Sequence, residues 1–116
     1  DAPTEFTSTA SGLKYRILRK SNNRKPLPSN KVEVDYRGWL DNGSTFDSSY
    51  NQRQPASFSL SQVIPAWTEG LQLLGEGGMI ELEVPPELGY GKKGNPPTIP
   101  PNATLHFKVE LLRILN

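Results

Sequence analysis

The sequence contains no cysteine, one histidine and one methionine. Without cysteine the chain cannot form disulfides, use a thiol nucleophile or bind a metal through thiolates. It also lacks any run of about 18 or more apolar residues, which is the signature of a membrane-spanning helix. These absences exclude disulfide scaffolds and thiol enzymes, and we expect no membrane span.

Neither positive nor negative charge is in large excess. The 13 Lys and Arg residues stand against 12 Asp and Glu, which gives a formal net charge of +1. Domains that bind nucleic acid are typically far more basic, so we expect no nucleic-acid partner. The basic residues concentrate in residues 1–31, which indicates either a solvated strand and loop or an arm that binds an acidic partner.

Length and apolar content predict one folded domain. A chain of 116 residues is close to the commonest domain size. Leu, Ile, Val and Phe account for 28 residues, about 24%, above the roughly 20% below which chains tend to be disordered. Residues 1–11 are small and polar, so we expect a loose lead-in followed by a domain over residues 12–116. The first residue is Asp1 instead of Met, from which we expect that a preceding segment was removed.

Alternation of apolar and polar residues predicts four to six β-strands. The clearest examples are residues 13–17, 32–38, 80–84 and 105–111. Leu111 and Leu112 break the last alternation and predict a β-bulge. Residues 41–43, Asp-Asn-Gly, predict a tight hairpin turn, because these residue types tolerate a positive φ. Residues 85–101 hold six of the eleven prolines and predict a long ordered loop.

One segment predicts a helix of about ten residues. Pro65 suits its first position, where the missing N–H costs nothing. Ile64, Trp67, Leu71 and Leu74 recur at helical spacing, and a glycine-rich stretch then stops the helix. Since a half-buried sheet must cover its apolar face, a single helix laid across antiparallel strands predicts an α+β fold.

The sequence gives little indication of nucleophilic, acid–base or metal-dependent catalysis. His106 lies between Leu105 and Phe107 on the outward side of an alternating strand, not in the cleft that a serine–histidine pair needs. Glu81 and Glu83 alternate with core positions, which indicates a solvated strand face. We therefore expect no metal ion and no cofactor.

The aromatic residues offer another kind of site. Four of them fall on inward-facing positions or at turn edges: Tyr36, Phe46, Trp67 and Phe107. Packing in the core would account for each one singly. Asp47 beside Phe46, and Tyr90 in the proline-rich loop, are different, because a core excludes polar groups that have no hydrogen-bond partner.

Four segments, in order along the chain, resemble the signature segments of the FKBP-type peptidyl-prolyl cis–trans isomerases, the macrolide-binding immunophilins, and most of all their bacterial members. They are residues 32–49 (VEVDYRGWLDNGSTFDSS), 58–71 (FSLSQVIPAWTEGL), 85–91 (PPELGYG) and 99–112 (IPPNATLHFKVELL). The likeness extends from about residue 13 to residue 115. It implies a bent antiparallel sheet of about five strands wrapped around one short α-helix.

The resemblance also implies a pocket between helix and sheet. Trp67 would form its floor, and the walls would be Tyr36, Phe46 and Phe107. Val63 and Ile99 would be further residues that bind substrate or macrolide. The catalytic groups implied are Asp47 on the rim, the backbone N–H of Ile64 and the hydroxyl of Tyr90, with the last two donating to ligand carbonyls.

The activity implied is acceleration of Xaa-Pro bond rotation during protein folding. The expected ligands are proline-containing polypeptides and macrolide inhibitors, and the expected state is a monomer. Ala56, Asn95 and Thr98 differ from the residues often found in the family, which bears on macrolide affinity. Bacterial members are often exported, which favours a location outside the cytoplasm. Two alternatives are a slow relative that serves as a chaperone or binding module, and an unrelated small β-sandwich or barrel.

Overall fold

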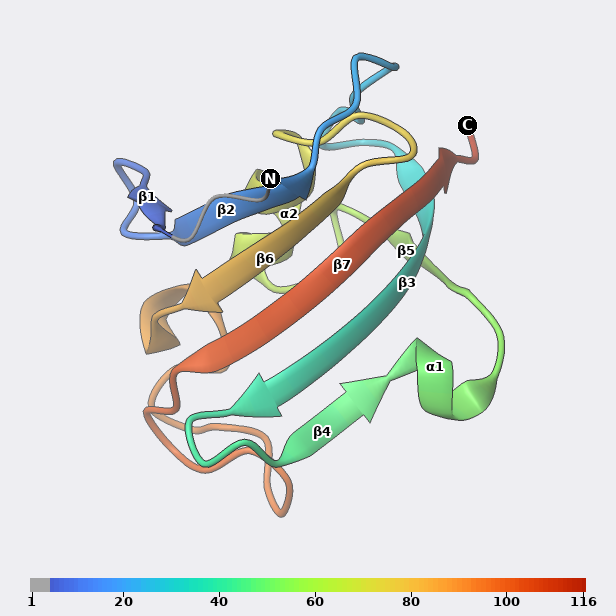
Figure 1. Cartoon of the computed structure of the whole chain (residues 1–116). Coiled ribbons are helices and arrows are strands. Elements are labelled where there is room, and N and C mark those ends of the chain that lie inside the picture. Colours follow the sequence, from blue (N-terminus) through green and yellow to red (C-terminus); the bar gives the residue numbers. More distant parts are fainter. Residues whose placement is uncertain (1–4) are drawn as a thin grey trace.

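Residues 5–116, the part of the chain that the computed structural model describes, contain seven β-strands in one antiparallel sheet (Figure 1). The strands are β1 (Thr7–Ser8), β2 (Lys14–Arg19), β3 (Lys31–Leu40), β4 (Thr45–Ser48), β5 (Ala56–Ser59), β6 (Met79–Val84) and β7 (Leu105–Ile114). The helices are α1 (Ser49–Gln52), α2 (Pro65–Leu71) and the 3₁₀-helix η1 (Pro86–Leu88). The predicted α+β fold is confirmed.

The two longest strands, β3 and β7, form the middle of the sheet. The strand order is β1-β2-β6-β7-β3-β4, and β5 also pairs with β3. Two short strands therefore share one edge of β3, with β5 along residues 31–34 and β4 along residues 37–39. Helix α1 connects β4 to β5 on that edge (Figure 1). This edge matters below, because β4 carries two residues of the site.

The prediction of about five strands was too low, and the shortest strands explain the difference. Strand β1 has two residues, with Thr7 opposite Tyr15 and Ser8 opposite Lys14. A pair of residues is too short to show a period of two, so the sequence did not indicate β1, which lies inside the segment expected to be loose. Residues 1–4 of that segment lie outside the described residues.

Helix α2 begins at Pro65 as predicted but is shorter than predicted, with seven residues. Beyond Leu71 the chain continues in tight turns, in which the Leu73 N–H donates to the Gly70 carbonyl and the Leu74 N–H to the Leu71 carbonyl. These turns keep Leu74 buried in the core, so the helical spacing of apolar residues extends past the end of the helix.

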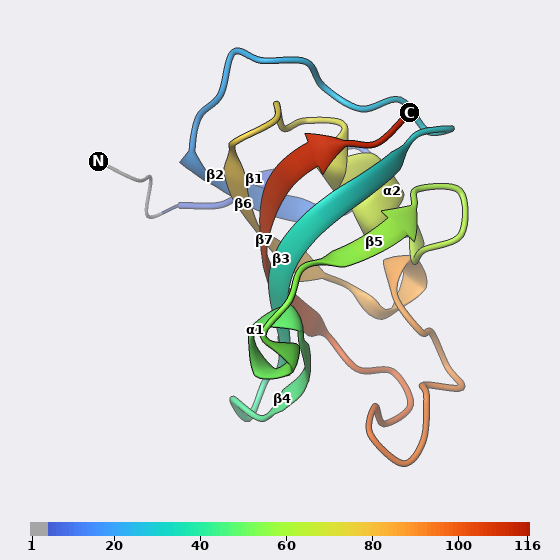
Figure 2. The same ribbon diagram turned by 90° about the vertical axis from the view of Figure 1, so that its right-hand side faces the viewer.

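The core lies between the sheet and α2. Figure 2 shows α2 and the loop after β6 on the same side of the curved sheet. Helix α2 buries Ala66, Trp67, Gly70 and Leu71, and Gly70 approaches the side chain of Leu82 on β6. In residues 5–116 no helix has both the length and the apolar character needed to cross a membrane.

Two local predictions are confirmed by the pairing of the strands. Opposite β3, the register steps from Arg113 to Leu111, so Leu112 is the extra residue of a bulge in β7. In the turn between β3 and β4, Gly43 has φ of +88°, and its N–H donates to the Leu40 carbonyl. The glycine supplies the positive φ that a tight hairpin requires.

Candidate active site

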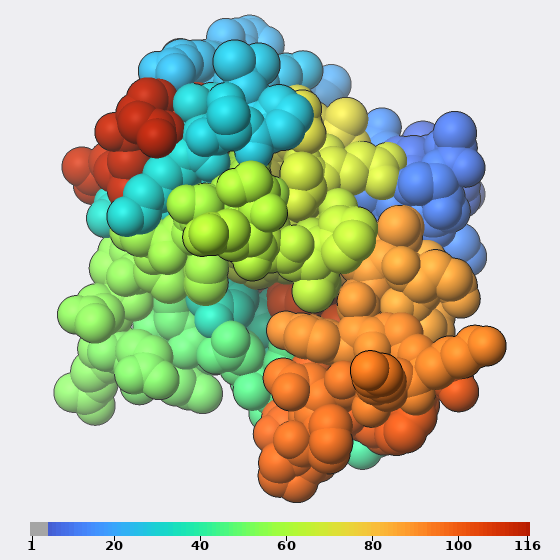
Figure 3. Space-filling model, turned by 180° about the vertical axis from the view of Figure 1, so that it is seen from behind, coloured from blue at the N-terminus to red at the C-terminus, as the bar shows by residue number. Residues whose placement is uncertain are grey.

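A cavity of about 370 Å³ opens on the side of the sheet that α2 covers. Figure 3 shows the hollow between the yellow-green segment before α2 and the orange loop that follows β6. Its lining is mostly aromatic and aliphatic and consists of Tyr36, Phe46, Asp47, Phe58, Gln62, Val63, Ile64, Trp67, Tyr90 and Phe107. Apolar walls with a few polar groups are typical of a ligand site.

Trp67 lies at the base of the cavity and contacts three other rings. It meets Tyr36, Phe58 and Phe107 edge to face, with ring centroids 5.2, 5.3 and 5.5 Å apart. Such pairs each add about 0.5–1.5 kcal/mol beyond the burial of their surface. Trp67 is 4% exposed, so little of its surface is open to water.

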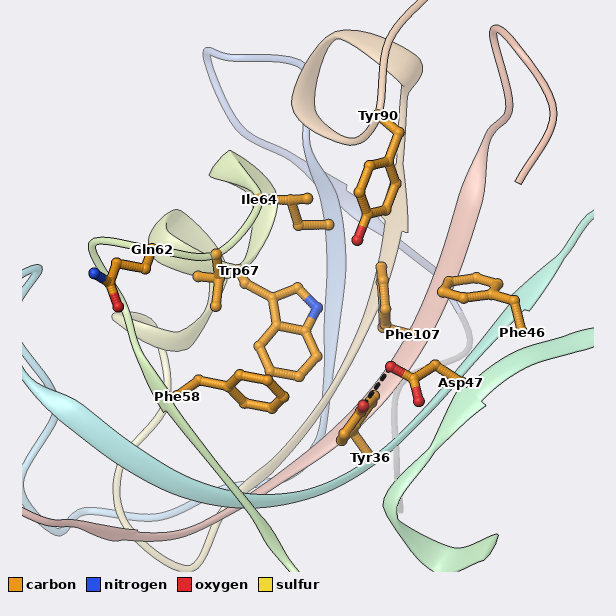
Figure 4. Close-up of a pocket in the computed structure, with 10 residues that line it drawn as sticks. Tyr36, Phe46, Asp47, Phe58, Gln62, Ile64, Trp67, Tyr90 and Phe107 are labelled. Atoms are coloured by element: carbon orange, nitrogen blue, oxygen red, sulfur yellow. Dashed lines mark hydrogen bonds between the residues drawn. The ribbon is translucent and has the colours of Figure 1, made fainter. Parts of the chain in front are cut away.

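The indole N–H of Trp67 has no hydrogen-bond partner among residues 5–116. Figure 4 shows the indole nitrogen on the side of the ring that faces Phe107. Phe107 is nearly perpendicular to the indole, at 83°. An N–H beside an aromatic ring can gain a weak contact with the ring's π face in place of an acceptor.

A bulge in β4 explains why Phe46 and Asp47, consecutive residues, both line the cavity. In a regular strand, neighbouring side chains point to opposite faces of the sheet. Here Gly38 of β3 pairs with Asp47, and the next residue, Trp39, pairs with Thr45, so Phe46 is an extra residue. A bulge re-aims side chains locally, which brings both Phe46 and Asp47 to the cavity.

Gly38 makes room for the aromatic wall on the same strand pair. A Cβ atom at this position would lie 2.6 Å from Cζ of Phe46 and 2.9 Å from Cε1 of Phe107. The two rings pack edge to face over the glycine, with centroids 5.5 Å apart. Any side chain at position 38 would therefore push one or both rings out of place.

Tyr36 and Asp47 form the strongest polar contact in the cavity. The Tyr36 hydroxyl donates to Oδ2 of Asp47 at 2.5 Å, and the backbone N–H of Ser48 donates to Oδ1 at 2.9 Å (Figure 4). Burial raises the pKa of Tyr36 well above its usual range, and the hydrogen bond to Asp47 and its charge raise it further. Tyr36 thus stays a neutral donor that orients the carboxylate.

Two donors on residues that line the cavity have no protein acceptor within residues 5–116. The Ile64 carbonyl accepts from Trp67 and Thr68 at the start of α2, but its N–H has no partner. The extended backbone of Ile64, with ψ of 149°, is the conformation favoured before a proline. The hydroxyl of Tyr90, a residue 39% exposed, is also unpartnered and points into the cavity (Figure 4).

The structure brings together eight of the nine residues implied by the resemblance. Ile99 is the exception: it is 2% exposed, packs in the core and is not among the lining residues. Its backbone pairs with Asn95 in the loop after η1, so it supports that loop from beneath. Contact of Ile99 with a ligand therefore stays a prediction.

Two lining residues were missed. Phe58 belongs to β5 and lies two residues after Ala56, on the same face of the strand. This spacing was a signal that could have placed it beside Trp67. Gln62 lies in the connection between β5 and α2, where neither periodicity nor turn residues point toward a cavity. The wall opposite Phe46 is therefore more extensive than the sequence indicated.

Comparison with known proteins agrees with this geometry. The family model for "FKBP-type peptidyl-prolyl cis-trans isomerase" matches residues 22–112. FkpA of Escherichia coli K12 is 48% identical over 107 residues, which cover 92% of this chain and 39% of that protein. Mip of Coxiella burnetii is 44% identical over 105 residues, covering 90% of this chain and 46% of that protein. The chain thus spans about two fifths to one half of these relatives.

Solved structures give the same result. The crystal structure of FkpA from Escherichia coli superposes with a TM-score of 0.92 at 46% identity, covering 97% of this chain and 52% of that one. AtFKBP13 superposes with a TM-score of 0.88 at 31% identity, covering 96% of this chain and 99% of that one. Sequence, fold and cavity together show that the chain belongs to the FKBP-type peptidyl-prolyl cis–trans isomerase family.

Proposed function

We propose that this domain is a peptidyl-prolyl cis–trans isomerase that accelerates rotation about Xaa-Pro bonds in polypeptide chains and so assists protein folding. The observation that carries the proposal is an aromatic cavity with two donors that have no acceptor in the described part of the chain, the Ile64 N–H and the Tyr90 hydroxyl. Proline rings are apolar and flat enough to lie against Trp67. The adjoining peptide carbonyls supply acceptors for the two donors.

The reaction needs no nucleophile, because only a rotation occurs. Resonance gives the C–N bond double-bond character, with a rotation barrier of about 18–20 kcal/mol. The planar amide carries extra negative charge on its oxygen, which water stabilises, and the twisted form loses this charge separation. An apolar cavity that excludes water therefore favours the twisted form relative to the planar one.

The acceleration required is modest for an enzyme. Uncatalysed prolyl exchange takes roughly 10–100 s. A turnover of about 10–1,000 s⁻¹ then requires on the order of 10²–10⁵-fold acceleration, or about 3–7 kcal/mol. Removal of water, two hydrogen bonds to carbonyls and a cavity shaped for the twisted bond together supply energies of this size. Asp47, held by Tyr36, would add a fixed negative charge beside the bond that rotates.

The remaining ligand proposals follow from the same cavity. Macrolides that present carbonyl oxygens and an apolar ring would compete with the peptide for the Ile64 N–H and the Tyr90 hydroxyl. Polypeptides that contain proline are the proposed substrates. We propose a monomer as the working unit.

Removal of the Tyr90 hydroxyl tests the proposal, with a matched control in the same chain. Tyr90→Phe should lower kcat/KM for a Leu-Pro peptide at least severalfold, while thermal stability stays the same because the hydroxyl bonds to no other group among the described residues. Tyr50→Phe removes a phenolic hydroxyl from another exposed residue, on α1 and outside the cavity lining. It should leave kcat/KM unchanged. Equal effects of the two substitutions would contradict the assignment of the site.

A further inference from the structure

Four side chains form a cluster on the outer face of the sheet, the face opposite the cavity. They are Arg37, Trp39, Asp41 and His106, here called the outer-face cluster. The rings of Trp39 and His106 are stacked, with centroids 5.7 Å apart and an interplanar angle of 15°. His106 Nε2 donates to Oδ1 of Asp41 at 2.7 Å, and the Arg37 guanidinium lies 4.6 Å from the Trp39 ring centroid.

The outer-face cluster joins β7 to the hairpin formed by β3 and β4. Trp39 lies directly opposite His106 in the β3–β7 pair, and Asp41 is in the turn. Arg37 holds the other side of this turn, because its Nε donates to Oγ1 of Thr45 at 2.8 Å. The cluster thus fixes the end of the hairpin at two points, one on β7 and one on β4.

The cavity wall lies directly behind this cluster. His106 precedes Phe107, Trp39 follows Gly38, and Phe46 follows Thr45. Phe46 and Phe107 meet over Gly38 on the inner face of the same strands. Because Phe46 is the extra residue of a bulge, the regular ladder of hydrogen bonds does not fix its position fully. The contacts on the outer face join the same hairpin to β7.

We propose that His106 and Asp41 are positioning residues, which hold the hairpin where Phe46 and Asp47 form the cavity wall, and that protonation of His106 tightens this hold. The inference rests on the proposed isomerase function. Histidine is the side chain whose charge ordinarily changes between pH 5 and 8. The sequence has one histidine, so a transition in that range has a single candidate side chain.

Other charged groups also face His106. The short contact to Asp41 decides whether protonation of His106 strengthens or weakens its attachment to the turn. From the neighbouring strands these groups are Glu83, Lys14, Lys108 and Arg37. Glu83, directly opposite His106 on β6, is already paired with Lys14 at 3.6 Å. The cations of β3 and β7 oppose a charged imidazole, but among residues 5–116 Asp41 alone is within hydrogen-bond distance of it. A proton on His106 therefore strengthens its attachment to the turn.

The expected effect is small, because the pair is partly in water. The His106 side chain is 18% exposed and that of Asp41 is 74% exposed. Ion pairs at exposed positions change an equilibrium by roughly 1.4- to 5-fold. We expect KM for a Leu-Pro peptide to rise by about this factor between pH 5 and pH 7.5, with a smaller change in kcat, since the cavity wall acts on binding.

Three variants test the inference by their pH profiles. His106→Gln keeps a donor near Asp41 but cannot change its charge, and Asp41→Asn removes the charge of the partner. Both should flatten the dependence of KM on pH. Arg113→Gln is the matched control, because Arg113 pairs with Glu33 at 2.7 Å across the same two strands at their other end. It should keep the wild-type profile. Identical profiles in all four proteins would overturn the inference.

A measurement that does not depend on catalysis separates this inference from the proposed function. In ¹H–¹⁵N spectra, the amide signals of Gly43, Phe46 and Asp47 should shift with the same midpoint as the His106 ring. In Asp41→Asn these shifts should disappear. If only amides of β7 followed the His106 titration, the inference would be wrong even for an active enzyme. If the amides of the hairpin followed it but no pH accelerated exchange, the proposed function would fail instead.

Discussion

Gly38→Ala should disturb the cavity from within the sheet. The new methyl group would lie 2.6 Å from Phe46 and 2.9 Å from Phe107, whereas carbon atoms in contact are ordinarily about 3.5–4.0 Å apart. Phe46 must therefore move by about 1 Å, and Phe107 by somewhat less. Overpacking of this kind typically costs about 1–3 kcal/mol of unfolding free energy. For a domain of this size each kcal/mol lowers the melting temperature by about 3–6 °C.

Phe46, the ring nearer to the new methyl group, lines the cavity. Phe46 is held on the sheet side by Gly38 and by Phe107, so we expect it to narrow the space above Trp67. The measurement is kcat/KM for a Leu-Pro peptide at a temperature where the variant remains folded, together with its thermal melt. Activity should fall in the folded protein by more than the unfolded fraction explains.

Gly70→Ala is the matched control, because it crowds a core contact away from the cavity. Its methyl group would lie 2.9 Å from Cδ2 of Leu82, the end of a flexible side chain. Alanine also favours helix over glycine by about 1 kcal/mol, which offsets the crowding. We expect little change in stability and unchanged kcat/KM.

A double-mutant cycle isolates the contact between position 38 and the ring of Phe46. In the Phe46→Leu background the ring atoms nearest the new methyl group are gone, so Gly38→Ala should cost less by at least about 0.5 kcal/mol. Equal costs in the two backgrounds, or full activity of the folded Gly38→Ala protein, would refute the role assigned to this glycine.

Three further outcomes are expected. Trp67→Ala should lower the unfolding free energy by about 3–5 kcal/mol in denaturant titrations and abolish turnover, since it removes the floor of the cavity. Asp47→Ala should cost about 1–3 kcal/mol, because it leaves the Tyr36 hydroxyl without its acceptor, and it should also lower kcat/KM; an unchanged rate would remove Asp47 from the site. The pKa of Tyr36 is raised in the folded protein, so the unfolded chain loses this proton first as pH rises. The contribution of Tyr36 to stability is therefore complete below pH ~10 and is lost as pH rises further. Alkaline unfolding should consequently have a shallower pH dependence in Tyr36→Phe, and an unaltered slope would contradict the assignment.

The longest strands could be predicted because one face of each is buried, which produces a regular alternation of apolar and polar residues. Strands β3, β6 and β7 alternate buried and less buried residues over most of their length, as their sequences do. The bulge at Leu112 was also visible, since two consecutive leucines break an alternation that is otherwise regular. In contrast, β1 has two residues and owes its place to pairing with β2, which no local pattern encodes.

The site was predictable in composition but not in geometry. Trp67 and Phe107 followed from helical and strand periodicity, and the resemblance to the family supplied the roles of Tyr90 and Ile64. The bulge that turns Phe46 and Asp47 toward the same cavity depends on how β4 pairs with Gly38 and Trp39 of β3. That register is set by contacts across the sheet, so the sequence of β4 alone does not determine it.

The positions of Ile99 and Phe58 also could not be predicted from local sequence patterns. Ile99 follows a proline-rich stretch that has no period, so its burial could be learned only from the folded loop. Phe58 shares a strand face with Ala56, but β5 has only four residues. The contact of Phe58 with Trp67 requires the curvature that brings β5 beside α2. Long-range packing, not propensity, decides both positions.

The most direct test is the cis-to-trans rate of a short Leu-Pro peptide, measured with and without this protein and with a macrolide inhibitor of the family. An apolar cavity that favours the twisted bond predicts a rate that increases in proportion to protein concentration and returns to the uncatalysed value when the inhibitor occupies the cavity. Absence of any acceleration by the folded protein would contradict the proposed function, and the aromatic cavity would then have to be explained as a binding site alone.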